Sequence, residues 1–169
     1  MSSCSRRHHA TGPGLVTAEI QLRSDATFRL SDFGRQRDLH VDNAETVDDV
    51  GPAGAQTASR RLTDARMLLI ACPYFVLERI DLVPHSDWQL NAISETWLLV
   101  LDGHAQVGPM SQSEGEAAFL ETDRATGQVG GNHFSGLIAY LGTDPRQGLS
   151  RALTGRTAGS SVHSMEVLS

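Results

Sequence analysis

The chain has 169 residues, of which 40% are hydrophobic and 20% charged, and its formal net charge is -6 at pH 7. This length suits one compact domain, or one small domain with part of another. The acidic balance argues against nucleic acid as a partner, because nucleic-acid binders gain affinity from basic surfaces. The longest apolar run, Met67 to Cys72, is far shorter than the ~20 residues of a membrane-spanning helix. We therefore predict a cytoplasmic protein with no nucleic-acid or membrane partner.

The N-terminal third is interpreted as a polar leader followed by two strands. Residues 1–10 are polar and lack an apolar period, which predicts a disordered leader. After the turn at Gly12-Pro13-Gly14, residues 15–22 alternate between apolar and polar positions, as a strand does, with Glu19 on the more polar face. Residues 27–30 form a second predicted strand that carries Arg29. Residues 42–50 are either a loop or a short helix.

Residues 51–60 are small and mostly uncharged, which is typical of a linker, and they mark a domain boundary. From 61 to 145, short apolar runs separated by turn signals predict a β-sandwich or β-barrel. These runs cover residues 67–72, 74–82, 92–101, 105–107, 117–121 and 136–141. The dipeptide Asp102-Gly103 between two of them predicts a hairpin with a type I′ turn. Residues 146–169 contain few large apolar side chains and are predicted to be a flexible tail.

Two blocks of the sequence resemble a known family. The first runs from His9 to Gln21 and from Ser24 to Leu30, and the second comprises residues 71–79 with the later runs VLDGHAQV and EGEAAFL. The first is similar to the segment around the last zinc-binding histidine of the class I mannose-6-phosphate isomerases, which are zinc enzymes built from cupin domains. The second resembles the C-terminal cupin of that family, and the two blocks keep the family's order.

The resemblance implies an all-β fold: a cupin (jelly-roll) barrel over 61–145, preceded over 11–50 by the leftover strands of a second, incomplete catalytic cupin. It also implies the family reaction, in which mannose 6-phosphate and fructose 6-phosphate interconvert with zinc as the cofactor. In the family, the other zinc ligands come from an upstream QxH motif and a glutamate. We therefore expect the chain to be the C-terminal portion of such an isomerase, too short to be a complete enzyme.

The resemblance also assigns the candidate site residues. His9 takes the position of the metal ligand, with His8 as the less favoured register. Arg29 matches the active-site arginine, whose planar cation suits an enediolate or a phosphate. Glu19 matches an acidic residue of the active-site strand, where a carboxylate can move a proton or orient a ligand. The alternatives are a solvated His9 and a cross-strand ion pair between Glu19 and Arg29.

The later histidines, His85, His104 and His133, lack the HxH spacing of a cupin metal site, so the second cupin is predicted to be metal-free. Trp88 and Trp97 are interpreted as packing in the core or at the mouth of the barrel, with the core favoured. Three functions stay open: an isomerase, a non-catalytic cupin module that completes a partner chain, and an inactive gene remnant. The partners implied are a sugar phosphate and a complementing N-terminal chain.

Overall fold

The computed structural model describes residues 58–121 and 124–153, together with Gly14, Ala18, Ile20, Gln36, Asp38 and Leu39. The predicted leader lies outside the described residues, as do most of the segment 11–50, most of the linker and the chain beyond residue 153. The predictions for those segments therefore stay predictions.

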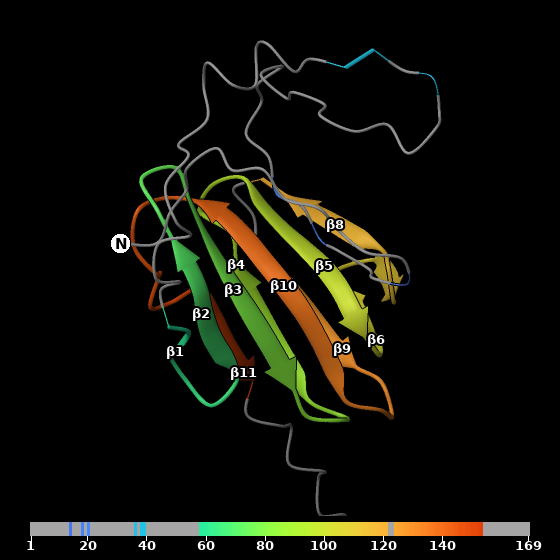
Figure 1. Ribbon diagram of the computed structural model, residues 1–169. Coiled ribbons are helices and arrows are strands. Elements are labelled where there is room, and N and C mark those ends of the chain that lie inside the picture. Colours follow the sequence, from blue (N-terminus) through green and yellow to red (C-terminus); the bar gives the residue numbers. More distant parts are fainter. Residues whose placement is uncertain are drawn as a thin grey trace, which may run out of the picture. The chain divides into compact units, whose positions relative to one another are not determined.

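The described residues form strands and no helix (Figure 1). The strands are β1 (Arg60–Arg61), β2 (Arg66–Ala71), β3 (Phe75–Leu82), β4 (Asp87–Asn91), β5 (Thr96–Asp102), β6 (His104–Val107), β7 (Met110–Ser113), β8 (Ala117–Leu120), β9 (Arg124–Val129), β10 (Phe134–Leu141) and β11 (Ser150–Leu153). The predicted all-β class is thus confirmed. Within the described ranges, no helix is long and apolar enough to cross a membrane.

The strands belong to two sheets, with the order β1-β2-β3-β10-β5-β8 in the first and β11-β4-β9-β6-β7 in the second. The pairs β2–β3, β5–β8, β4–β9 and β6–β9 are antiparallel. Between β3 and β10 the chain passes repeatedly from one sheet to the other, giving the orders β3-β10-β5-β8 and β4-β9-β6-β7. These orders are those of an eight-stranded jelly roll. The predicted jelly-roll fold is therefore confirmed for these residues.

The described residues divide into two compact units. The first comprises residues 58–80 and 137–145, and it contains β1, β2 and most of β3 and β10. The second comprises residues 81–121, 124–136 and 146–153, and it contains β4 to β9 together with β11.

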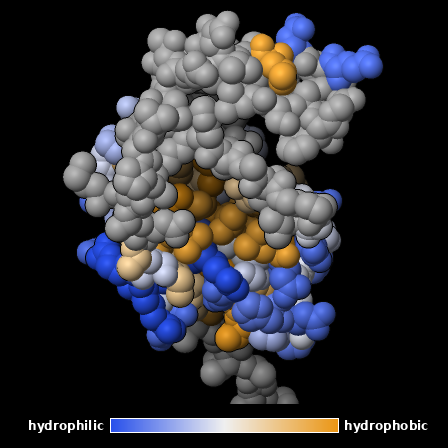
Figure 2. Space-filling view, viewed as in Figure 1, coloured by the Kyte–Doolittle hydropathy of each residue, from blue (hydrophilic) through white to orange (hydrophobic). Residues whose placement is uncertain are grey.

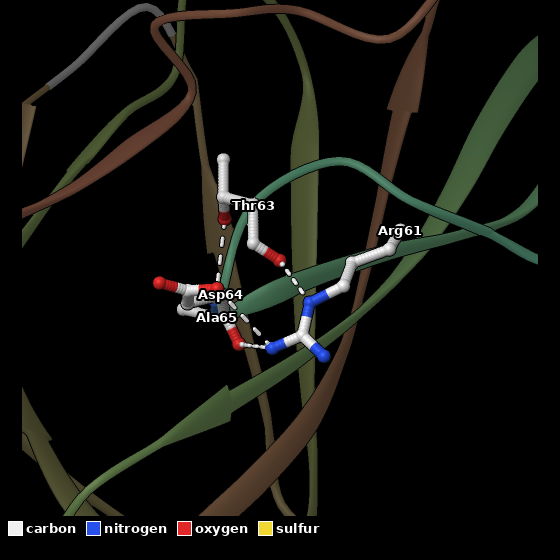
Figure 3. Close-up of polar contacts among 4 residues, drawn as sticks. All are labelled: Arg61, Thr63, Asp64 and Ala65. Carbon is white, nitrogen blue, oxygen red and sulfur yellow. Dashed lines mark hydrogen bonds and ion pairs between the residues drawn. The ribbon is translucent and has the colours of Figure 1, made fainter.

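In the first unit, Arg61 closes the turn that precedes β2 (Figure 3). Its Nε donates to the Thr63 carbonyl at 3.2 Å, and its Nη2 donates to the carbonyl and to Oδ1 of Asp64, at 3.2 and 3.3 Å. The Ala65 amide donates to Thr63 Oγ1 at 3.3 Å. The ion pair between Arg61 and Asp64 is exposed and adds little stability. The pair acts locally, because it belongs to the turn that leads directly into Arg66, the first residue of β2.

β2 contains an irregularity in its pairing with β3. Leu68 lies opposite Glu78, and the pairing resumes with Ile70 opposite Leu77, so Leu69 is an extra residue on the β2 side, as in a β-bulge. Arg66 lies opposite Ile80. Because side chains alternate along a strand, Arg66 therefore shares a face of the sheet with Glu78.

In the second unit, β4, β6 and β9 alternate strictly between buried and more exposed positions. The buried set is Trp88, Leu90, Ala105, Val107, Ala125 and Val129, and it forms the apolar face of this sheet. Trp88 lies opposite Gly127. A Cβ atom on Gly127 would lie 2.3 Å from the indole Cε2 of Trp88, so only glycine leaves room for that ring. Trp88 is 1% exposed, which confirms its predicted place in the core.

The favoured core position is wrong for Trp97. The alternation of β5 buries Leu98 and Val100, so Trp97 faces outward and is 52% exposed. Its ring packs on Phe119 of β8, with the centroids 4.7 Å apart. Figure 2 shows apolar residues, coloured orange, over the middle of the face in view.

The predicted hairpin at Asp102-Gly103 is also wrong. β5 pairs with β8, and β6 pairs with β7 and β9, so the chain crosses between sheets at Gly103 instead of turning back. Gly103 has a φ of 85°, and a Cβ atom there would lie 2.2 Å from the His133 carbonyl oxygen. The glycine is needed for this close approach. The hairpin found here joins β6 and β7 through Gly108, which has a φ of 57°.

The structure also differs from the predicted tail of 146–169 in its first residues. Ser150–Leu153 form β11, which pairs with β4, and Leu149 just before it is 1% exposed. The hydrogen bond from the Asn91 amide to the Leu149 carbonyl, at 2.7 Å, extends this pairing. Burial of Leu149 and the backbone bonds to β4 hold residues 149–153 in the sheet, although the local sequence is polar.

Candidate functional site

The residues that the resemblance assigned to the catalytic site are His9, Glu19 and Arg29. All three lie outside the described residues. Their roles as metal ligand, acidic residue and oxyanion-binding arginine therefore remain predictions.

The described ranges, 58–121 and 124–153 with the few isolated residues before them, contain no group of three or more His, Cys, Asp or Glu side chains placed to hold a metal ion. His104 Nε2 lies 2.7 Å from Ser111 Oγ, and His133 Nε2 lies 3.8 Å from Asp81 Oδ1. Neither histidine has the further ligands that a catalytic zinc needs. The described residues thus do not fit a zinc centre, and a zinc site would have to be built from other residues, His9 among them.

A buried cluster of Arg66, Glu78 and Tyr140 lies in the first unit. Arg66 is 3% exposed, Tyr140 2% and Glu78 0%. The Arg66 guanidinium donates two parallel hydrogen bonds, from Nε to Glu78 Oε2 and from Nη2 to Oε1, both 2.7 Å long. The Tyr140 hydroxyl donates a third to Glu78 Oε1 at 2.5 Å. Fork-to-fork pairing of this kind is the strongest geometry for an ion pair.

The buried cluster is built to hold strands together rather than to act on a ligand. It joins β2, β3 and β10, and both Glu78 oxygens are occupied by protein donors and removed from solvent. No ligand can therefore reach this carboxylate without breaking the cluster. The sequence did carry a signal for it, because Glu78 interrupts an apolar strand and a buried carboxylate requires a partner. Sequence reasoning assigned no role to Arg66 or Glu78.

A groove of about 320 Å³ opens in the second unit, and most of its exposed surface comes from apolar atoms. We call it the polar groove after the polar side chains among its lining residues. Four polar side chains line it: Asp87 of β4, Gln106 of β6, and Thr126 and Gln128 of β9. Gly108, Gly127 and Leu153 complete the lining. The polar residues occupy the strand positions that alternate with the buried apolar set, so they face away from the core.

The register of three strands brings the groove's polar side chains together. Gln106 lies opposite Gln128, and Gln128 lies opposite Asp87, so the three form one row across β6, β9 and β4. Directly opposite side chains have Cβ atoms about 4.5–5.5 Å apart. Gln128 Nε2 donates to Asp87 Oδ1 at 2.9 Å, and Gln106 Nε2 donates to the Gly108 carbonyl at 3.2 Å.

These bonds fix the two amides and leave part of their capacity unused. Each glutamine amide has two N–H donors and a carbonyl acceptor, and only one donor of each is engaged. Asp87 and Thr126 also line the groove, and no described residue bonds Asp87 Oδ2 or the Thr126 hydroxyl. The groove can therefore bind a polar ligand. Its lining contains a single carboxylate and no basic side chain.

Sequence reasoning missed the groove because Asp87, Thr126 and Gln128 lie on β4 and β9, two strands that it did not predict, and only Gln106 lies on a predicted run. β4, β7 and β9 are short and half polar, so they contain no long apolar run. The alternation of Ala125, Gly127 and Val129 with Thr126 and Gln128 was the available signal.

No protein-family model matches the chain. A mannose-6-phosphate isomerase from Streptococcus mutans serotype c is 32% identical to it over 91 residues, which cover 49% of this chain and 26% of that protein. The chain thus spans about a quarter of the length of the curated relative it matches. This match agrees with the resemblance drawn from the sequence blocks. Together with the jelly-roll fold, it supports a relationship to the cupin superfamily.

Several solved structures share part of the fold. Ectoine synthase from P. lautus superposes with a TM-score of 0.45 at 6% identity, covering 63% of this chain and 90% of that one. A cupin-2 domain protein from Shewanella frigidimarina has a TM-score of 0.40 at 9% identity, and the match covers 48% of this chain and 83% of that one. A cupin superfamily protein from Desulfitobacterium hafniense also has a TM-score of 0.40, at 14% identity, and the match covers 48% of this chain and 80% of that one. At these scores and identities, nothing about the function of this chain follows from the likeness.

Proposed function

We propose that the chain is a cupin module of a mannose-6-phosphate isomerase, and that it takes part in the interconversion of mannose 6-phosphate and fructose 6-phosphate. The observation that carries the proposal is the 32% identity to the Streptococcus mutans isomerase. The jelly-roll connectivity of the described residues is compatible with it.

In this proposal, the part of the chain that the structure describes supports the enzyme and the N-terminal segment contributes to its chemistry. The buried cluster saturates its own charges, and the described residues present no metal-binding group. The reaction moves a proton between two sugar carbons through an enediol. We propose that Arg29 stabilises the oxyanion of that enediol, that Glu19 assists the proton transfer, and that His9 is one ligand of a zinc ion that supplies Lewis-acid chemistry.

The sequence contains no QxH motif. We propose that the remaining zinc ligands come from another segment, which makes the chain a complementing module instead of a self-sufficient isomerase. This form of the proposal is favoured over a complete enzyme because one histidine and one carboxylate are fewer than the three protein ligands that catalytic zinc takes.

The test is to measure isomerase turnover and bound zinc for the chain alone and co-purified with a separately expressed N-terminal part of the Streptococcus mutans enzyme. We expect turnover and stoichiometric zinc only in the complemented sample. Arg29→Ala should lower kcat there by roughly 10²–10³-fold, as loss of an oxyanion donor does. Arg37→Ala is the matched control and should leave kcat unchanged.

Two results would contradict the proposal. Turnover and stoichiometric zinc in the chain alone would show that it completes its own site. Absence of turnover in the complemented sample, with both parts folded and bound to each other, would show that the chain does not serve this reaction.

A further inference from the structure

We propose that the polar groove of the second unit binds an uncharged polyol of about the size of one monosaccharide. The inference rests on Asp87, Gln106, Thr126 and Gln128 and is independent of the isomerase proposal. The groove lies within one unit, and all of its lining residues are described.

The hydrogen-bonding capacity left in the groove is mixed. One N–H of each glutamine amide, both amide carbonyl oxygens, the second Asp87 oxygen and the Thr126 hydroxyl have no described partner. The row therefore presents donors and acceptors side by side. A hydroxyl group donates one hydrogen bond and accepts others, so adjacent hydroxyls on one small molecule match this pattern better than a ligand that only donates or only accepts.

The charge of the groove argues against a phosphorylated ligand. Its only ionisable lining residue is the carboxylate Asp87, which repels an anion. Arg151 of β11 does not line the groove, and its Nε donates to Gln89 at 3.0 Å. A cationic ligand matches the groove less well, because an ammonium group only donates and would leave the remaining N–H donors of Gln106 and Gln128 without an acceptor.

The size and rigidity of the groove fit a small ligand. A volume of about 320 Å³ lies at the lower end of the ~300–1,000 Å³ that small-molecule sites occupy. The side chains of Gln106 and Gln128 are each tied down by a hydrogen bond to the protein, so binding costs little further ordering. Behind them, the Trp88 ring fills the space over Gly127, and this packing fixes the backbone of β9.

The experiment titrates the full ¹⁵N-labelled chain with D-mannose, D-glucose and sorbitol and follows the side-chain amide signals of Gln106 and Gln128 by NMR. We expect a saturable shift of these signals with at least one of the three polyols. Inorganic phosphate and spermidine, titrated at the same ionic strength, should give no saturable shift. Binding of phosphate or spermidine without any polyol would overturn the assignment, and so would the absence of saturation with every polyol.

Matched variants locate the binding. Gln128→Leu removes one amide from the row and should weaken polyol binding by at least ~5-fold, the equivalent of one hydrogen bond. Gln89→Leu alters a glutamine on the same sheet outside the groove and should leave the dissociation constant unchanged within about 2-fold. If Gln128→Leu fails to fold, Gln106→Leu replaces it with the same expectation. Undiminished affinity in a folded variant of the row would place any binding elsewhere and refute the site.

Discussion

The buried cluster and the polar groove use similar side chains in opposite ways. In the cluster, Glu78 accepts three hydrogen bonds and is 0% exposed. In the groove, Asp87 accepts one hydrogen bond from Gln128, and no described residue bonds its second oxygen. The difference teaches that polar composition alone does not distinguish a structural site from a candidate binding site. The unused hydrogen-bonding capacity distinguishes them, and stability measurements test that distinction.

The largest effect is expected from Glu78→Ala. The substitution leaves the Arg66 guanidinium buried without its carboxylate, and removal of one partner of a buried pair costs about 3–5 kcal/mol. Urea denaturation of the purified chain measures the free energy of unfolding. A loss below ~1 kcal/mol would show that the cluster does not hold the strands together as inferred here.

The double variant Arg66→Met with Glu78→Leu sharpens this test. It replaces the whole pair with apolar side chains of similar volume, a change that is often neutral or stabilising. We therefore expect it to recover most of the stability lost in Glu78→Ala. If the double variant is as unstable as the single one, the shape of the cluster rather than its unpaired charge determines the loss.

An intermediate effect is expected from Gly127→Ala. The new methyl group would lie 2.3 Å from the indole Cε2 of Trp88, and overpacking of this kind costs about 1–3 kcal/mol. Thermal unfolding and tryptophan fluorescence measure the loss and the displacement of the ring. Gly148→Ala is the control, because a Cβ atom there meets nothing within 4 Å. Equal stability of the two variants would mean that the contact with Trp88 relaxes freely.

The smallest effect is expected from Gln128→Leu on stability. Its hydrogen bond to Asp87 is exposed, and surface substitutions away from special features change the free energy of unfolding by about 0.5 kcal/mol or less. Urea denaturation of this variant, compared directly with Glu78→Ala, measures the contrast between groove and cluster. A loss of several kcal/mol would place Gln128 among the structural residues and remove the distinction between the two sites.

The sequence predicts one of the two sheets far better than the other. The apolar runs at 67–72, 74–82 and 136–141 correspond to β2, β3 and β10 of the first sheet. Most of the missed strands, β4, β7, β9 and β11, belong to the second sheet. Each is short, and β4 and β9 carry polar residues at alternate positions, as in Asp87, Gln89 and Asn91 of β4. A polar outward face shortens the apolar run that sequence reasoning looks for.

A different physical reason limited the prediction of sites. Family resemblance directed attention to His9, Glu19 and Arg29, which lie outside the described residues. The groove depends on strand register, which brings Gln106, Gln128 and Asp87 side by side. Up to 41 residues separate these side chains in the sequence. Register is set by pairing between distant segments, and no local pattern in one sequence reveals it.

The extra residue in β2 has a consequence for how related sequences vary. Arg66 and Leu68 keep their register with β3 on one side of Leu69, and Ile70 and Ala71 keep theirs on the other. Loss of Leu69 would join these two registers into a regular ladder, and Arg66 would still face Glu78. In evolutionary terms, this is the point in the strand where a homologue can lose one codon and retain the ion pair, so a one-residue gap in an alignment of relatives belongs here.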